Sequence, residues 1–149
     1  MTEEKVSALN FVKMHGLGND FVVLDFTRSP FPARVDWPSL ATKALDRHFG
    51  IGGDGLVLIL PSDLADYRMR IFNPDGSEAE MCGNAIRCVT KYLFDRGLLQ
   101  GKKVKVETLA GLMLPEVVEE GGVAKEVIVD MGIPTLKSRD IPVLVDREE

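Results

Sequence analysis

The sequence has little that would direct it to nucleic acid, to a membrane or to a disulfide-stabilised fold. Lys and Arg number 18 against 23 Asp and Glu, and the net charge is -5. Without a basic cluster, the chain lacks the contacts that phosphates need. No apolar run approaches the roughly 20 residues of a membrane-spanning helix. The polar start of the chain, Met1 to Lys5, lacks the apolar core of a signal peptide. Two cysteines are too few for a disulfide framework, so we expect reduced thiols and a cytoplasmic protein.

What is present is a chain of 149 residues, 45% of them hydrophobic, which is enough for one domain with its own core. Its pattern predicts an α+β fold of mostly strands around one or two helices. Apolar runs and alternation predict strands at residues 10–14, 21–26, 56–60, 67–72, 103–108, 112–118 and 126–131. Residues 15–20 are expected to form a turn-rich loop.

Two helices are predicted. The first begins at Asp36 and ends near Gly50. The second begins near Asn84, and Gly97 lies where its C-terminal cap belongs. It places apolar side chains on one face, at residues 85, 88, 89, 92 and 93. Gly121-Gly122 is typical of either a hairpin turn or a boundary between units.

Cys82 immediately precedes the second helix. A helix N-terminus carries unpaired N–H groups and the positive end of the macrodipole, and both stabilise a thiolate. Gly83 leaves room for a ligand, and the N–H groups of Gly83 and Asn84 could hold a carboxylate. The alternative is a small apolar side chain packed before a helix. Cys88 shares the apolar face and is expected to be a core residue.

The run Gly50-Ile51-Gly52-Gly53-Asp54-Gly55 matches the dinucleotide-binding pattern letter by letter. A dinucleotide fingerprint follows a strand and opens a helix, whereas this run follows a helix and opens a strand. We therefore expect a tight turn and no nicotinamide site.

Several polar residues have both a structural and a functional interpretation. Asn19 and Asn73 each lie in a turn and can bond their own backbone or a substrate. His15 precedes a glycine-containing loop and fits either role. The acidic residues between the strand at 67–72 and Cys82, namely Asp75, Glu78 and Glu80, are expected to be solvated.

Three blocks together resemble the diaminopimelate epimerase family. They are Met14-His15-Gly16-Leu17-Gly18-Asn19-Asp20-Phe21, Gly50-Ile51-Gly52-Gly53-Asp54-Gly55, and Arg70-Ile71-Phe72-Asn73-Pro74-Asp75-Gly76-Ser77 followed by Met81-Cys82-Gly83-Asn84-Ala85-Ile86-Arg87-Cys88. They stand in the family's order, and the resemblance covers roughly residues 11 to 131.

The resemblance implies an isomerase that interconverts L,L- and meso-diaminopimelate for lysine and peptidoglycan synthesis, without pyridoxal phosphate or a metal. It implies an α+β lobe of mostly antiparallel strands wrapped around a central helix. Two cysteines, one thiolate and one thiol, would act on opposite faces of the substrate α-carbon, and Cys82 matches the first of them. Asn19 and Asn73 match substrate-binding asparagines, and Gly83 and Asn84 match the backbone donors to the α-carboxylate. The full-length enzyme could be a homodimer.

The chain departs from the family in length, because the second catalytic cysteine belongs to a C-terminal lobe that is not in this sequence. We expect residues 1–120 to form the N-terminal lobe and residues 121–149 the first strands of a second lobe. We also expect the fragment to be inactive alone. The alternatives are a related cofactor-independent amino-acid racemase and a non-catalytic ligand-binding domain in which Cys82 is merely packed.

Overall fold

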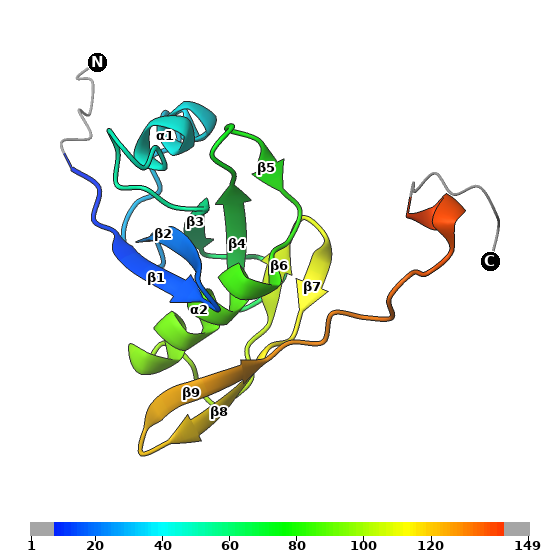
Figure 1. Ribbon diagram of the computed structural model, residues 1–149. Helices are drawn as coiled ribbons and strands as arrows, with labels where there is room; N and C mark the ends of the chain where they lie inside the picture. The colour runs from blue at the N-terminus through cyan, green and yellow to red at the C-terminus, as the bar shows by residue number, and fades with distance from the viewer. Residues whose placement is uncertain (1–7, 142–149) are drawn as a thin grey trace.

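The computed structural model describes residues 8–141, and its strands form one large sheet and one hairpin (Figure 1). The large sheet has the order β1-β2-β3-β4-β6-β7, with β5 paired to β4. Its members are β1 (Val12–Gly16), β2 (Asn19–Asp25), β3 (Gly55–Leu60), β4 (Tyr67–Phe72), β5 (Glu78–Ala79), β6 (Val106–Thr108) and β7 (Gly111–Met113). The β2–β3 and β4–β6 pairs are parallel, and the other pairs of this sheet are antiparallel.

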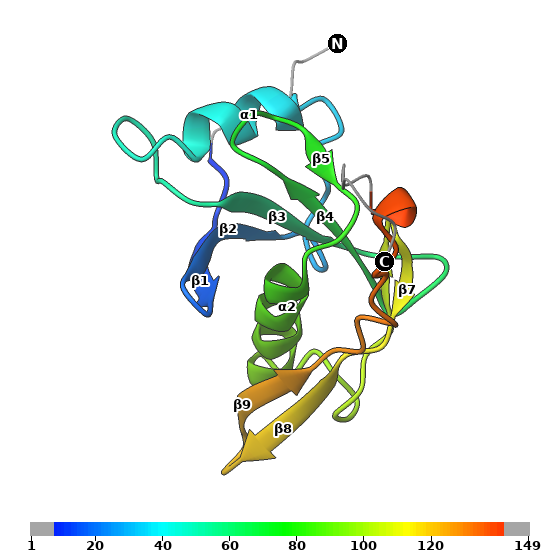
Figure 2. The same ribbon diagram turned by 45° about the vertical axis from the view of Figure 1, so that its right-hand side comes forward.

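Strand β3 is buried along its whole length, because both faces of the sheet are covered there. Leu56 and Leu58 belong to a core cluster with Trp37 and Ala41 of helix α1 (Trp37–Ala44). Val57 and Ile59 face the other way and belong to the cluster around helix α2 (Gly83–Asp95). Figure 2 shows the two helices on opposite faces of the sheet. A fully apolar strand of this kind is expected wherever helices pack on both faces.

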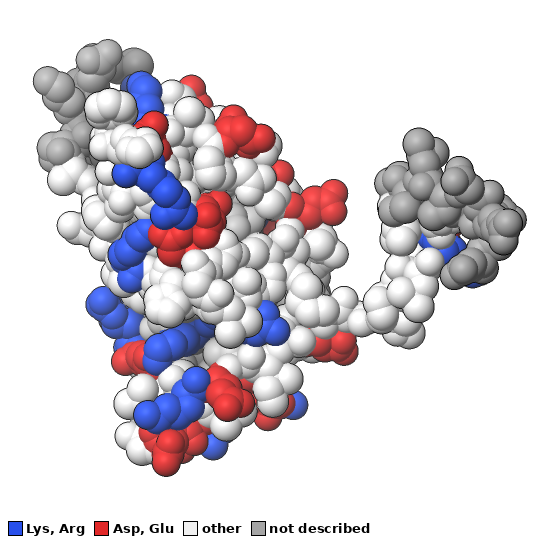
Figure 3. All heavy atoms as spheres, viewed as in Figure 1, with Lys and Arg blue, Asp and Glu red and all other residues white. Residues whose placement is uncertain are grey.

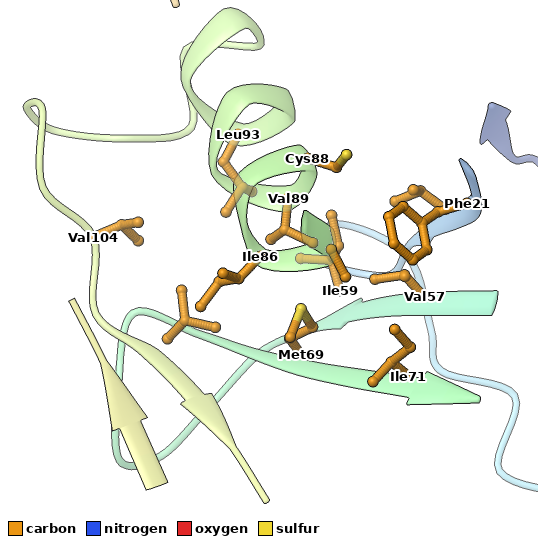
Figure 4. Close-up of a cluster of buried hydrophobic side chains, with 13 residues drawn as sticks. Phe21, Val57, Ile59, Met69, Ile71, Ile86, Cys88, Val89, Leu93 and Val104 are labelled. Carbon is orange, nitrogen blue, oxygen red and sulfur yellow. The ribbon is translucent and has the colours of Figure 1, made fainter. Parts of the chain in front are cut away.

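Helix α2 is the centre of the lobe. On one side it packs on the sheet through Ile86, Val89 and Leu93, which are 0% exposed (Figure 4). On the other side it contacts the hairpin of β8 (Glu116–Glu120) and β9 (Val123–Ile128) (Figure 2). The predicted α+β lobe, with mostly antiparallel strands around a central helix, is confirmed.

Gly121 and Gly122 form the turn of the β8–β9 hairpin, with φ of 62° and 80°. These positive φ values are what a two-residue hairpin turn needs, and glycine adopts them without a Cβ penalty. After β9 the chain runs away from the body of the lobe and enters the short helix η1 (Ser138–Asp140) (Figure 1). Ile133 and Leu136 in this stretch are 95% and 83% exposed.

Five of the predicted elements need correction. Residues 15–20 are not a loop, because β1 and β2 continue to a tight turn at Leu17-Gly18. The first helix ends at Ala44, well before Gly50, because the chain turns after Leu45 and the Asp46 carboxylate accepts the N–H groups of His48 and Phe49. The strand predicted at residues 112–118 is divided into β7 and β8 by Pro115, which has no N–H to donate. The strands predicted at 103–108 and 126–131 are β6 and β9, with shifted ends.

The turn after α1 generates a stability prediction. A Cβ on Gly50 would collide with the backbone carbonyl groups of Lys43 and Ala44, at 2.7 Å from the Ala44 oxygen. Gly50→Ala should therefore lower the free energy of unfolding by about 2 kcal/mol or more, because backbone cannot move aside as a side chain can. Chemical denaturation measures this change. Gly101→Ala is the matched control, since a Cβ there meets nothing within 4 Å. Equal stability of the two variants would contradict the prediction.

Candidate active site at the start of helix α2

The strand registers bring three chain segments to one edge of the sheet. Phe21 of β2 pairs with Gly55 of β3, and Leu56 of β3 pairs with Phe72 of β4. The beginnings of β2 and β3 and the end of β4 therefore lie at the same edge. Glu78 of β5 pairs with Phe72, so the chain enters α2 from this edge as well. The hairpin turn of β1 and β2 also reaches α2, because a Cβ on Gly16 would lie 3.2 Å from the carbonyl oxygen of Asn84.

Cys82 is the N-cap residue of α2, with an extended backbone (φ −142°, ψ 119°). Its carbonyl oxygen accepts the N–H of Ile86 at 3.0 Å, which starts the helix, but its side chain makes no capping bond. The thiol is half-buried and free of any disulfide. Within residues 8–141, the N–H groups of Gly83 and Asn84 donate to no protein acceptor, as expected for the first turn of a helix. A thiol and two N–H donors without a protein acceptor thus stand side by side.

Asn19 is the residue that the fold places against this helix start. Its Oδ1 lies 3.9 Å from Sγ of Cys82 and 3.4 Å from Nδ2 of Asn84. The three residues come from the start of β2 and the start of α2, which are 63 positions apart in the chain. The predicted residues Asn19, Cys82, Gly83 and Asn84 are therefore brought together.

Asn73 lies at the same sheet edge, but its side chain bonds within its own turn. Its Nδ2 donates to Oγ of Ser77 at 2.9 Å, and its N–H donates to the Ser77 carbonyl oxygen. Its own carbonyl oxygen accepts from Gly76. Among the described residues Asn73 makes no bond to Asn19, Cys82 or Asn84.

The ends of two side chains lie close to Gly83. A Cβ there would lie 3.1 Å from Nη1 of Arg87 and 3.2 Å from Sδ of Met131, which follows β9. The chain after β9 therefore passes beside the first turn of α2.

Of the acidic residues before Cys82, Asp75 and Glu80 are exposed, as expected, whereas Glu78 is half-buried. Glu78 accepts two hydrogen bonds from Arg70, at 2.7 and 2.9 Å, and this bidentate pair lowers the pKa of Glu78. Asp75 accepts from the Ser77 hydroxyl and N–H, and these bonds lower the pKa of Asp75. Both carboxylates therefore have protein partners that stabilise their charge.

Cys88 lies on the core side of α2 and is 4% exposed (Figure 4). Burial raises the pKa of the Cys88 thiol to about 11, so it is protonated at neutral pH. The prediction that Cys88 is a core residue is confirmed.

A charged network behind Asn19 could not be seen in the sequence. Asp54 accepts from Nδ2 of Asn19 and from the N–H of Asp20, each at 2.9 Å, and pairs with Arg47 at 2.9 Å. Asp20 pairs with Arg47 at 2.7 Å and with Lys13 at 2.5 Å. The sequence signals for this cluster are Asp20, in the first of the three blocks, and Asp54, in the glycine-rich run. That run connects the turn after α1 to β3, and Gly52 within it has a φ of 80°.

Outside this site, residues 8–141 show neither a metal-binding group nor a membrane-spanning helix. Lys and Arg are interleaved with Asp and Glu on the face in Figure 3. Residues 8–141 contain no group of three or more His, Cys, Asp or Glu able to hold a metal ion. No helix in that range is both long and apolar enough to cross a membrane.

The network generates a pH prediction. Hydrogen bonds from Arg47 and then from Lys13 lower the pKa of Asp20 far below its ordinary range. The pairs therefore stabilise the fold above the unfolded-state pKa of about 3.9, and this stabilisation is lost as the pH falls below it. Since Arg47 is 55% exposed, the effect is modest.

Melting temperatures across an acid series should fall less steeply for Arg47→Gln than for the unsubstituted chain. Arg34→Gln is the control, because Arg34 is exposed and makes no ion pair within the described residues. Parallel acid profiles for the Arg47 variant and the unsubstituted chain would refute the assignment of this pair.

Comparison with solved structures supports the fold. A hydroxyproline epimerase from Agrobacterium vitis matches with a TM-score of 0.61 and 22% identity, over 78% of this chain and 39% of that one. A methylitaconate-delta-isomerase matches with a TM-score of 0.63 and 20% identity, over 78% of this chain and 36% of that one. At these identities the likeness concerns the fold alone.

Sequence comparison is more specific. A protein from Pelotomaculum thermopropionicum named diaminopimelate epimerase is 58% identical over 134 residues, which are 90% of this chain and 48% of that protein. One of the same name from Acetivibrio thermocellus is 57% identical over 141 residues, 94% of this chain and 49% of that protein. The chain thus spans about half the length of these relatives. The profile of the family described as diaminopimelate epimerase matches residues 11–137, and the chain belongs to this family.

Proposed function

We propose that this chain is the N-terminal half of a diaminopimelate epimerase, in which Cys82 is one of two catalytic cysteines. The observation that carries the proposal is the position of the Cys82 thiol. It is half-buried at the start of α2, makes no capping bond and lies against Asn19 and Asn84. A family member of this kind interconverts L,L- and meso-diaminopimelate without pyridoxal phosphate or a metal.

Inversion of a stereocentre requires two groups on opposite faces of the carbon, one to remove the proton and one to deliver another. Cys82 is proposed to serve one face. Cys88 is unsuited to the other, because it is buried on the core side of the same helix. The second cysteine is therefore expected in the part of the protein beyond Glu149.

The substrate's α-carboxylate is proposed to bind the N–H groups of Gly83 and Asn84. Their lack of a protein acceptor and the dipole of a 13-residue helix both favour an anion there. The same donors would stabilise negative charge that develops when the α-proton leaves, and this matters because no electron-withdrawing cofactor takes part. Asn19 is proposed to contact the substrate from β2.

Asn73 is proposed as a second substrate contact, as in the family. Its amide would then have to exchange its bond to Ser77 for one to the substrate. The bond lies in an exposed turn, so solvent offsets much of its loss.

The lobe boundary expected after residue 120 would fall in the turn of the β8–β9 hairpin. Both strands of this hairpin contact α2. We therefore propose that the first lobe extends through Ile128 and that the second begins beyond it. Two free cysteines favour a reducing, cytoplasmic location for the enzyme.

The first test is substitution in the full-length protein. Cys82→Ala should reduce epimerisation of diaminopimelate by about 10²- to 10⁴-fold, because an acid–base group is lost. Cys88→Ala is the matched control and should retain most of the activity. Competition by diaminopimelate and by proline separates this function from that of a related racemase. Full activity of the Cys82 variant would leave a non-catalytic role for this residue.

The second test uses residues 1–149 alone. In deuterated water, this chain should not exchange the α-proton of diaminopimelate, because one face of the carbon lacks its cysteine and the second lobe is not there to exclude water. Proton NMR of the α-position measures the exchange. A clear exchange rate that depends on Cys82 would contradict the expected inactivity of the fragment.

A further inference from the structure

The amide of Asn19 has only one orientation that satisfies its neighbours. An ionised carboxylate accepts hydrogen bonds and donates none, so the Asn19 atom at 2.9 Å from Oδ2 of Asp54 must be the nitrogen. The other amide atom, facing Sγ of Cys82 and Nδ2 of Asn84, is then the oxygen. The reversed orientation would place two oxygens together at Asp54 and two NH₂ groups together at Asn84.

Asp54 is itself held in place by several bonds. Oδ1 pairs with Arg47, while Oδ2 accepts the N–H of Asp20 as well as the Asn19 amide. The backbone N–H of Asp54 donates to the Asp20 carbonyl oxygen at 2.7 Å. Just before it, the N–H of Gly53 donates to the carbonyl oxygen of Leu45. The carboxylate therefore presents a fixed acceptor to Asn19.

This arrangement decides which amide atom of Asn19 faces the sulfur of Cys82. An amide oxygen can accept from a thiol but repels a thiolate, whereas an amide NH₂ group would donate to a thiolate and stabilise it. With its oxygen directed to Sγ, Asn19 offers the sulfur an acceptor and no donor. Without a fixed acceptor at position 54, the amide could turn and present NH₂ to the sulfur.

We propose that Asp54 is a positioning residue that acts through Asn19 and biases Cys82 toward the thiol before substrate binds. The inference rests on the proposed function: of the two cysteines, Cys82 would begin the cycle as the acid that gives its S–H proton to the α-carbon. Asp54 contacts neither Cys82 nor the substrate's proposed donors. Its effect is transmitted by the direction of one amide.

Alkylation of Cys82 tests this in residues 1–149, without substrate. Iodoacetamide reacts with the thiolate, and peptide mass spectrometry at neutral pH follows the Cys82 and Cys88 peptides separately. Asp54→Ala should label Cys82 about threefold to tenfold faster, the range expected when one hydrogen bond changes. Asn19→Ala should act in the same direction. The double variant should match Asn19→Ala, because Asp54 acts only through that amide.

A matched control separates positioning from general loosening. Asp95 also accepts a backbone N–H, from Ala124, and pairs with a cation, Lys91, but at the other end of α2. Asp95→Ala should leave Cys82 labelling unchanged. Asp54→Asn keeps the size of the side chain, but the new amide can turn, so this variant should give an intermediate acceleration. It replaces Asp54→Ala as the test variant if Asp54→Ala does not fold.

Nitrogen-15 NMR gives an independent readout. The Asn19 side-chain NH₂ signals should report a hydrogen bond to a carboxylate in the unsubstituted chain and lose it in Asp54→Ala, while backbone signals of α2 keep their positions. The inference is overturned by any of three results: labelling of Asp54→Ala at the unsubstituted rate, multiplicative effects of the two substitutions, or equal acceleration by Asp95→Ala. Because no measurement here needs diaminopimelate, failure of the proposed function leaves this test intact.

Discussion

The two-sided burial of β3 is the constraint on which the rest of this lobe depends. Its residues alternate between a core shared with α1 and a core shared with α2, so both helices are fixed against one strand. Leu58, Val57 and Ile59 are 0% exposed, and each buried side chain of this size stabilises the fold by about 1.5–3 kcal/mol. Since β3 cannot slide without exposing these side chains, its first residue and the preceding Asp54 have a defined place beside the start of β2.

The arrangement of polar groups where β2 and β3 begin follows from that constraint. Strand and helix starts leave donors that the regular hydrogen-bond pattern does not use, and here the starts of β2, β3 and α2 meet. Asp54 satisfies the N–H of Asp20 and the amide of Asn19 at once. The N–H groups at the start of α2 stay available. The same packing that closes the core thus leaves the backbone donors at the start of α2 without a protein acceptor. They lie next to the Cys82 thiol, which makes no capping bond.

Several apolar side chains of the lobe are exposed among the described residues. Leu114, Ile133 and Leu136 are all more than half exposed, at 63%, 95% and 83%. Groups of exposed apolar side chains mark surfaces that bury against another unit. The second lobe proposed above would give these side chains a partner and enclose Cys82 from the other side.

The sequence by itself determined the local elements and the chemistry-bearing residue. Helical periodicity and Gly97 located α2, which in turn identified Cys82 as a residue at a helix start. Alternation located β4 with its observed bounds. The extent of α1 and the break at Pro115 were missed. The Asp46 side chain accepts backbone N–H groups just after α1, and Pro115 has no N–H to donate. The spacing of apolar residues reports neither of these features.

Only the tertiary structure decided how the site is assembled. Asn19 and Asp54 are 35 residues apart, and nothing local to either predicts that one directs the amide of the other. The bond exists because parallel pairing of β2 with β3 aligns their starts, and this alignment depends on burial of β3 between two helices. Hydrophobic burial is non-directional and summed over the whole lobe, so sequence pattern reveals which side chains are buried but not which polar groups burial brings together.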